Sequence, residues 1–398
     1  MMRSMLEFNI CVGRDVSMAE ETVLASASSK GKHSVVKPKK RRNKRIAIGV
    51  CATLAVVLVG AGVAVALWAQ SVQETMAYED EEFEEIAQVL VEPDEEEAEE
   101  PYYVLILGSD ARTSGSASRS DTIILARVDA ENAQITLISI PRDTMVTIDG
   151  YGTQKINAAY ALGGASLAIE VVSEYAGVDI AHCVEVHFDE AVEVVDAVGG
   201  IEIDVEESIS VEGVTLSPGT QTLTGEQALA YARDRKHVTG GDFGRAKAQR
   251  QVIMAVAEKI LSSSAADIPG LVEQCAECVT TDYTLEELLE LASALAGEDL
   301  TFYSSICPSY TYNVSGISYV ATMYAEWQEM MQRVDAGLDP SDEDAEIPEE
   351  QASNEALGAA TNGAGPSDYE SLAASRLNTS SVEDDDETED ETEDEGSE

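Results

Sequence analysis

The sequence predicts an α/β protein: one three-layer α/β/α domain with a central mixed sheet, preceded by one transmembrane helix. Strand-like and helix-like segments alternate between residues 102 and 334, which favours a sheet covered by helices on both faces. A stretch without any charged residue, residues 46–73, is long enough for a helix that crosses a bilayer. A basic segment precedes this stretch, whereas acidic segments follow it and end the chain.

The first 70 residues have the pattern of a membrane anchor. Residues 1–45 form a basic cytoplasmic segment with eleven lysines and arginines and four acids, a net charge of about +7. The apolar stretch exceeds the central region of a cleavable signal peptide, so we expect a retained signal anchor at residues 46–70. Because basic residues stay on the cytoplasmic side, the remainder of the chain is expected outside the cell, at a single-pass cell membrane location.

Two acidic segments flank the domain of this 398-residue chain, whose formal net charge is −50. Residues 71–101 are expected to form an extracellular spacer, which the repulsion between its acids would extend. Residues 335–398 are predicted to be a disordered tail, because they combine low hydrophobicity with like charge. Residues 102–334 are enough for one domain with a core. An external domain this acidic is not expected to bind nucleic acid, whose affinity for proteins depends on cations.

The elements of the domain are predicted from runs of β-branched residues and from helical periodicity. Thr224 is expected to cap a helix N-terminus in the sequence TGEQ. We expect strands at residues 102–110, 121–129, 133–143, 182–188, 200–205 and 300–306, and helices at 157–175, 189–198, 224–233, 247–261, 285–296 and 318–333.

Most of the cations beyond the apolar stretch lie in two groups. This part of the chain holds 14 lysines and arginines against 71 acids, and residues 156–232 contain no lysine or arginine. The first group lies at the opening strands, and the second lies in and after YARDRKHVTGGDFGRAK, residues 231–247, where Gly240 and Gly241 permit a tight turn. Such positions can converge beyond the carboxyl ends of strands, where α/β folds bind ligands. Arginine suits bidentate phosphate contacts, and ion pairs with the abundant acids are the structural alternative.

Carboxylates occur at the same strand ends. Asp110 follows LILGS at the end of the first strand, Asp121 opens the second, and Asp143 follows Arg142 at the end of the third. Two carboxylates that face a phosphate would suit Mg²⁺, although an aspartate in such a position can also cap a turn. Arginines and carboxylates together suggest phosphoryl chemistry.

Histidines and cysteines suggest no other chemistry. The chain has four histidines, of which His182 and His187 are expected to be structural and remote from the arginines, so a zinc hydrolase is not favoured. The external cysteines could form disulfides or be buried as thiols; they are Cys183, Cys275, Cys278 and Cys307.

Seven motifs within residues 102–261 together resemble the LytR-CpsA-Psr family of membrane-anchored envelope enzymes. They are LILGSDAR, SRSDTIILARVD, ITLISIPRDTMV, KINAAYALGG, VGGIEIDV, LTGEQALAYARDRK and DFGRAKAQRQ. The resemblance implies a phosphotransferase that moves an anionic or secondary glycopolymer, such as teichoic acid or capsular polysaccharide, from a polyprenyl-diphosphate carrier to a peptidoglycan hydroxyl. It also implies contact with the lipid bilayer that holds the carrier. The alternatives are a polyprenyl-diphosphate pyrophosphatase and a non-catalytic envelope regulator or scaffold.

The resemblance also implies roles for individual residues. Asp110 and Asp121 match the acids that bind Mg²⁺, with Mn²⁺ as the alternative ion. The residues that match the diphosphate-binding set are Arg119, Arg142, Arg233, Arg235, Arg245 and Gln249. The catalytic residues are expected to be Arg142, Asp121, Arg233 and Arg235. Many members have a further arginine three residues after the arginine of DFGR, whereas this chain has Ala248 there and Arg250 two residues later.

Overall fold

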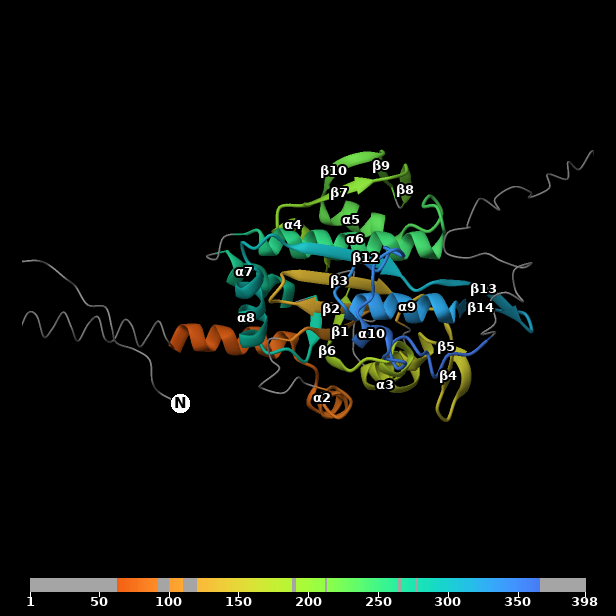
Figure 1. Ribbon diagram of the computed structural model, residues 1–398. Helices are drawn as coiled ribbons and strands as arrows, with labels where there is room; N and C mark the ends of the chain where they lie inside the picture. The colour runs from red at the N-terminus through yellow and green to blue at the C-terminus, as the bar shows by residue number, and fades with distance from the viewer. Residues whose placement is uncertain are drawn as a thin grey trace, which may run out of the picture. The chain divides into compact units, whose positions relative to one another are not determined.

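A six-stranded mixed sheet forms the centre of the domain (Figure 1). The computed structural model describes residues 63–91, 100–109, 120–187, 191–211, 213–263, 267–276 and 278–365. In order across the sheet, the strands are β11 (Val279–Thr281), β6 (Ile180–His187), β1 (Tyr102–Ser109), β2 (Thr122–Asp129), β3 (Gln134–Ser139) and β12 (Thr301–Ile306). The β1–β6 and β3–β12 pairs are parallel, whereas β2 is antiparallel to both of its neighbours. The predicted central mixed sheet is therefore confirmed.

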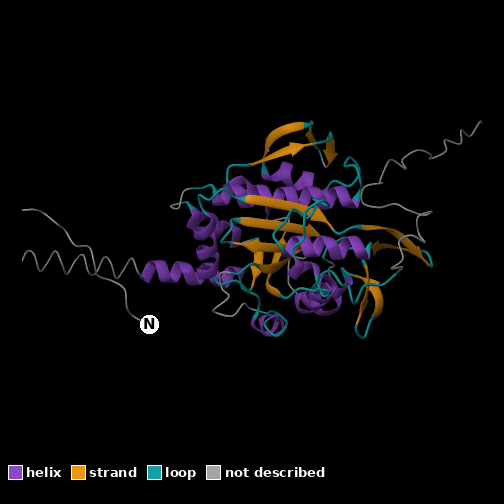
Figure 2. Ribbon diagram, viewed as in Figure 1, coloured by secondary structure: helices purple, strands orange, loops and turns teal. Residues whose placement is uncertain are grey.

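Helices cover both faces of this sheet (Figure 2). Successive residues of a strand point to opposite faces, so Leu105 and Val104 of β1 belong to different clusters. Leu105 packs on the face covered by α3 (Ala158–Ala176) and α9 (Tyr324–Asp335). Val104 packs on the other face, where half-buried residues of α6 (Asp242–Leu261) and α8 (Leu285–Leu295) complete the cluster. These two clusters make three layers.

Local sequence signals determine where the helices near the site begin. Helix α5 (Gly225–Arg233) begins after Thr224, whose hydroxyl accepts a hydrogen bond from the Gln227 amide at 3.4 Å. The Gln227 side chain in turn accepts from the Thr224 amide at 3.0 Å, which completes a capping box. Helix α6 begins five residues before its predicted start, directly after the turn formed by Gly240 and Gly241, whose φ angles are 93° and 55°. The chain therefore turns at the glycine pair and enters the helix at Asp242.

The predicted helix at residues 318–333 is wrong in its first part. Residues Ile317–Thr322 form β14, which pairs with β13 (Ser309–Val314) through a turn at Ser315 and Gly316, both with positive φ. The β-forming residues of ISYVAT favour this hairpin over a helix. Other elements are β4 (Met145–Ile148), β5 (Gly152–Lys155), α4 (Ala191–Ala197), β7 (Ile201–Val205), β8 (Ile209–Val211), β9 (Val214–Leu216), β10 (Gly219–Leu223) and α7 (Ile268–Ala276). Strand β7 pairs with β10, outside the central sheet.

The segment predicted as an extended acidic spacer packs against the domain. A helix at residues 63–76 is followed by α2 (Asp80–Ile86). Met76 and Ile86 are fully buried in two of the hydrophobic clusters, and burial of such side chains outweighs the repulsion between the acids. Residues 92–99 lie outside the described residues, as does the predicted membrane anchor up to residue 62. None of the helices in the described part is both long and apolar enough to cross a membrane.

The folded domain also extends beyond its predicted end at residue 334. Residues 335–365 include α10 (Glu349–Ala352), and Leu357 and Ala360 lie in the same cluster as α3 and α9. The Gly358 amide donates to the carbonyl of Ala176 at 2.6 Å. Residues 366–398 of the predicted tail lie outside the described residues. Cys183, Cys275 and Cys307 are free thiols.

Candidate active site

The candidate site lies at one edge of the central sheet. Strands β1, β3, β6 and β12 run in the same direction, so their carboxyl ends share this edge, and the antiparallel strand β2 begins there. Asp121 precedes β2, and its amide donates to the carbonyl of Gly108 at 2.9 Å. Arg142 follows the end of β3 by three residues. The topology thus brings together side chains that are far apart in the sequence.

Two arginines and two aspartates form a ring of ion pairs at this edge. Arg142 contacts Asp121 at 2.6 Å through Nη1 and Asp242 at 3.4 Å through Nε. Arg235 contacts the same two carboxylates, at 3.8 Å from Nη2 to Asp121 and 3.6 Å from Nε to Asp242. We call these four residues the ion-pair ring. Because each carboxylate faces both guanidinium groups, the ring holds two cations close together.

Arg245 lies beneath the ion-pair ring. Its Nη2 is 2.9 Å from Asp242 Oδ1 and donates to the Asp121 carbonyl at 3.1 Å, and only 5% of its side chain is exposed. Burial lowers the pKa of Arg245, and the neighbouring Arg235 and Arg142 lower it further against the opposing effect of Asp242. Burial also lowers the pKa of Arg142, but Asp242 and Asp121 outweigh burial there, so the pKa of Arg142 is raised. Both side chains are cations at neutral pH.

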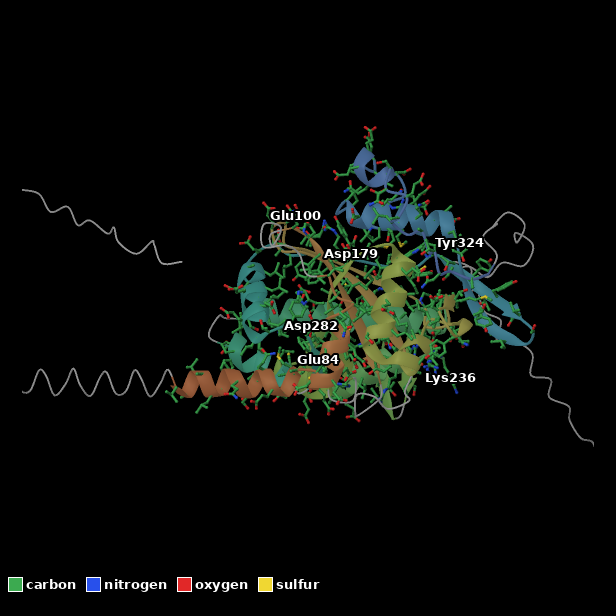
Figure 3. All side chains as sticks on the ribbon, turned by 90° about the horizontal axis from the view of Figure 1, so that it is seen from below. Glu84, Glu100, Asp179, Lys236, Asp282 and Tyr324 are labelled. Atoms are coloured by element: carbon green, nitrogen blue, oxygen red, sulfur yellow. The ribbon has the colours of Figure 1, made fainter. Side chains whose placement is uncertain are left out.

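A cavity of about 640 Å³ opens beside the ring. Its lining includes Asp121, Arg233, Arg235, Arg245 and Gln249, all of which the sequence pattern had selected. Lys236, which Figure 3 labels, adds a further cation to the same wall, and His237 also lines it. Arg142 borders a narrower neighbouring pocket that shares Asp121, Arg245 and Gln249 with the cavity. The cavity therefore presents an arginine-rich wall to a ligand.

Several buried polar atoms at this edge have no hydrogen-bond partner among the described residues. They include the Nε atom of Arg245 and the hydroxyl of Thr122, and Arg142 Nε has only its 3.4 Å ion pair with Asp242. Buried donors are normally satisfied, and such exceptions are frequent where a ligand or an ion binds. Unsatisfied guanidinium donors beside a cavity suit an anion with several oxygens, such as a phosphate or diphosphate.

Asp121 and Asp242 of the ion-pair ring are carboxylates that a metal can reach. Asp234 also lines the cavity, but its carboxylate accepts hydrogen bonds from the amides of Lys236 and His237 at 2.9 and 3.3 Å. No group of three or more His, Cys, Asp or Glu residues arranged for a metal ion occurs among the described residues. This donor set still fits Mg²⁺, which uses one or two protein carboxylates and completes its shell with phosphate oxygens and water. It does not fit zinc, whose structural sites are closed by four nitrogen or sulfur ligands.

The remaining predicted residues have different outcomes. Asp110 and Arg119 lie outside the described residues. Arg250 points away from the cavity: it is only 4% exposed, and its Nη1 donates to the Ser139 hydroxyl at 2.5 Å. Burial lowers the pKa of Arg250 to about 10. Arg250 therefore does not occupy the place that Ala248 leaves without a cation.

Sequence reasoning missed two parts of the site. Asp242 was not selected, although it opens the DFGR motif; Ser210 and Val211 of the β8–β9 hairpin also line the cavity, and no sequence signal pointed to them. His187 is the last residue of β6, its Nε2 lies 3.2 Å from the Thr280 hydroxyl, and it is not among the residues that line the cavity. His182 is structural, hydrogen-bonded to Asp282 at 2.6 Å and stacked on Tyr283.

Comparison with known proteins identifies the family. The profile of the LytR_cpsA_psr family matches residues 63–335. The Enterococcus faecalis polyisoprenyl-teichoic acid–peptidoglycan teichoic acid transferase TagU is 37% identical over 251 residues, 62% of this chain and 81% of the relative. A crystal structure of Bacillus subtilis TagV has 32% identity and a TM-score of 0.50, covering 56% of this chain and 91% of TagV. A structure of TagT bound to LI-WTA has 28% identity and a TM-score of 0.50, covering 60% and 91%. This chain therefore belongs to the LytR-CpsA-Psr family and is a transferase of that family.

Proposed function

We propose that this enzyme transfers an anionic or secondary cell-wall glycopolymer from a polyprenyl-diphosphate carrier to a hydroxyl of peptidoglycan. The observation that carries this proposal is the ion-pair ring, with Arg245 beneath it, at the wall of a cavity of about 640 Å³. The names of the relatives support the substrate class, since TagU is a transferase between polyisoprenyl-teichoic acid and peptidoglycan. The enzyme would act at the outer surface of the cell membrane, where its carrier is embedded.

The diphosphate would bind against the arginine-rich wall. Arg142, Arg235 and Arg245 present guanidinium groups from three different segments of the chain, and Arg233 lines the same cavity. Gln249 would add an amide donor, and Arg119, which lies between β1 and β2 in the sequence, would complete the set. Forked guanidinium groups bind two phosphate oxygens each, which fixes the position of the diphosphate as well as neutralising its charge.

Asp121, together with Asp110, would hold Mg²⁺ or Mn²⁺. The side chain of Asp121 is 33% exposed, so an ion can reach it from the cavity. When bound, the ion would supply positive charge that stabilises the phosphate oxygens in the transition state.

In the proposed reaction, the oxygen of a peptidoglycan hydroxyl attacks the phosphorus on the sugar side of the diphosphate. A new phosphorus–oxygen bond forms, the bond from this phosphorus to the bridging oxygen breaks, and polyprenyl phosphate leaves with that oxygen. The hydroxyl proton passes to a carboxylate of the site or to water. Arg142, Arg233 and Arg235 would stabilise the charge that develops during this exchange.

The polyprenyl tail would lie in the layer between the sheet and helices α6 and α8. Val104, Ile124 and Leu137 of the sheet face this layer. Opposite them, Ile253 and Met254 of α6 and Leu288 and Leu291 of α8 are only half buried. Half-buried apolar side chains on facing elements can separate to admit a hydrocarbon chain at a smaller cost than a close-packed core can.

The experiment combines the full chain in detergent with a short lipid-diphosphate-linked glycan, peptidoglycan oligomers and Mg²⁺, and detects the ligated product by mass spectrometry. Arg142→Ala is expected to lower transfer about 10²–10³-fold, as loss of a group that stabilises transition-state charge does. The control is Lys247→Ala, because Lys247 pairs with Glu206 outside the main cavity.

Full transfer by Arg142→Ala would contradict the proposal. Cleavage of the carrier without ligation, even with acceptor present, would favour a pyrophosphatase. Binding of the carrier without turnover would favour a scaffold.

A further inference from the structure

The helix at residues 63–76 changes character at Trp68. Residues 63–67 read Val-Ala-Val-Ala-Leu and are all exposed; Val63, Val65 and Leu67 have 55%, 61% and 63% of their surface accessible. We call these residues the exposed apolar segment. Because successive helical residues are about 100° apart, its side chains cover all sides of the helix. A helix that is apolar all round is typical of an apolar environment such as a membrane.

Residues 68–76, which we call the docked segment, are amphipathic. Val72 and Met76 are 3% and 1% exposed and pack with Ala276 of α7 and Leu285 of α8, beside which the helix lies in Figure 1. The other side of the docked segment is exposed and polar; it consists of Gln70, Ser71, Glu74 and Thr75. The docked segment therefore has one face on protein and one face suited to water.

Three hydrogen bonds hold the docked segment in one position. Trp68 Nε1 donates to the carboxylate of Glu273 in α7 at 3.1 Å. The Gln73 side chain accepts from the Leu285 amide at 2.6 Å and donates to the Tyr283 carbonyl at 3.3 Å. Two of these partners are backbone groups, at Tyr283 between β11 and α8 and at Leu285, the first residue of α8, so the segment is fixed to the frame of the domain and not only to flexible side chains.

We propose that a lipid bilayer surrounds the exposed apolar segment, that Trp68 lies at the bilayer surface, and that the docked segment holds the catalytic domain on the membrane in one orientation with α7 facing the lipid. This rests on the membrane location given in the proposed function. The sequence of residues 46–62, directly before this segment, is also uncharged and apolar. Tryptophan is enriched at membrane interfaces. Eight helical residues separate Trp68 from Met76, a rise of about 12 Å.

Tryptophan fluorescence can test the position of the bilayer surface. The full chain would be placed in phosphatidylglycerol vesicles whose acyl chains carry bromine at defined depths. The chain has only two tryptophans, and Trp327 is fully buried in the core, so quenching reports on Trp68 and a Trp68→Phe variant gives the background. We expect quenching by bromines near the headgroups. No quenching at any depth would overturn the inference, because protein or water would then surround this part of the helix.

A pair of glutamine variants tests the fixed orientation. Gln73→Ala removes two hydrogen bonds to the domain, whereas the control Gln70→Ala removes one bond within the helix, to Glu74. Transfer would be measured from a full-length carrier in vesicles and from a short, water-soluble carrier. We expect Gln73→Ala to lower transfer several-fold from the membrane-embedded carrier only, and Gln70→Ala to change neither rate.

Equal rates for the two variants in vesicles would overturn the fixed orientation. If the unaltered chain fails to use the short carrier at all, the proposed function fails, and the quenching result still decides the inference about the bilayer.

Discussion

Glu185 gives the protein a pH-dependent stability. It lies in β6 with 1% of its surface exposed; Tyr160 donates to its Oε2 at 2.6 Å, and its Oε1 has no partner among the described residues. Burial, assisted by the nearby Glu82, raises the pKa of Glu185 to about 7, against the opposing hydrogen bond from Tyr160. Between pH 4.5 and about 7, Glu185 therefore keeps a proton in the folded state that it has already lost in the unfolded state, where its pKa is near 4.5.

The stability that this proton contributes is present below pH 4.5 and is lost as the pH rises to about 7. We expect Glu185→Gln to stabilise the protein at pH 7.5, by at most about 3 kcal/mol, and to have little effect at pH 4.5. Thermal unfolding across this range would measure the difference, with the exposed Glu202→Gln as the control. A difference between the variant and the unaltered chain that does not depend on pH would contradict the assignment.

Asp121 is a proposed metal ligand, so transfer is expected to depend on the metal and on this carboxylate. Chelation by EDTA is expected to abolish transfer, and added Mg²⁺ should restore it if the ion neutralises the diphosphate as proposed. Asp121→Asn should require more Mg²⁺ for half-maximal transfer, because an amide is a weaker ligand than a carboxylate. Titration of transfer against Mg²⁺ checks this. An unchanged Mg²⁺ requirement would exclude Asp121 as a ligand.

Residues at strand ends could be predicted from the sequence, whereas residues on α6 could be predicted only in part. Asp121 and Arg142 adjoin recognisable strands, and the strand direction alone brings them to one edge. Arg245 and Arg250 depend on the phase of a helix whose start was misplaced by five residues. Arg245 and Arg250 are five residues apart, which places them about 140° apart around the helix axis. Arg245 therefore reaches the site, whereas Arg250 packs on the sheet.

At the scale of elements, the contact between α6 and the preceding turn positions the arginines. A Cβ atom on Gly244 would lie 2.4 Å from the carbonyl of Thr239 and 2.9 Å from the Val238 side chain. We expect Gly244→Ala to push the turn away from α6 and so to displace Arg235 relative to Arg245. Transfer should fall by at least tenfold, since misplacement of about 1 Å can cost 10²-fold.

The matched control is Gly270→Ala in α7, where a Cβ meets nothing within 4 Å. That substitution should stabilise the protein by about 0.5–1 kcal/mol, through helix propensity alone, and leave transfer unchanged. Kinetic assays and thermal unfolding of both variants would measure this. Equal transfer rates for the two variants would show that close packing at Gly244 is unimportant for the site.

At the scale of the whole molecule, the folded unit is longer than residues 102–334. A chain of residues 68–365 should unfold cooperatively, whereas one of residues 102–334 should be unstable. The shorter chain lacks Val72, Met76, Ile86 and Leu357, each at most 3% exposed. Burial of such side chains contributes about 1.5–3 kcal/mol each, and a domain is stable by only about 5–15 kcal/mol.

Calorimetry of the two chains, and of residues 68–334 and 102–365, would separate the contributions of the two ends. Equal melting temperatures for all four chains would contradict this account. Composition alone misled the boundaries, because a few apolar residues among many acids are enough to attach a segment to an existing core. Those residues form no periodic pattern, so the sequence could not predict which cluster they join.

The ion-pair ring has a thermodynamic consequence. Asp121 is already neutralised by Arg142 at 2.6 Å, so a divalent cation that binds there alone must displace a guanidinium group, and a diphosphate that binds alone must displace a carboxylate. When both bind, the cation takes Asp121 and frees Arg142 for the diphosphate, and the diphosphate takes Arg142 and frees Asp121 for the cation. On the proposed mechanism their affinities are thus positively coupled, typically by about 1–3 kcal/mol, and each ligand strengthens the other equally. The complex with both the carrier and the ion would then be favoured over complexes with the carrier alone or the ion alone, neither of which could react.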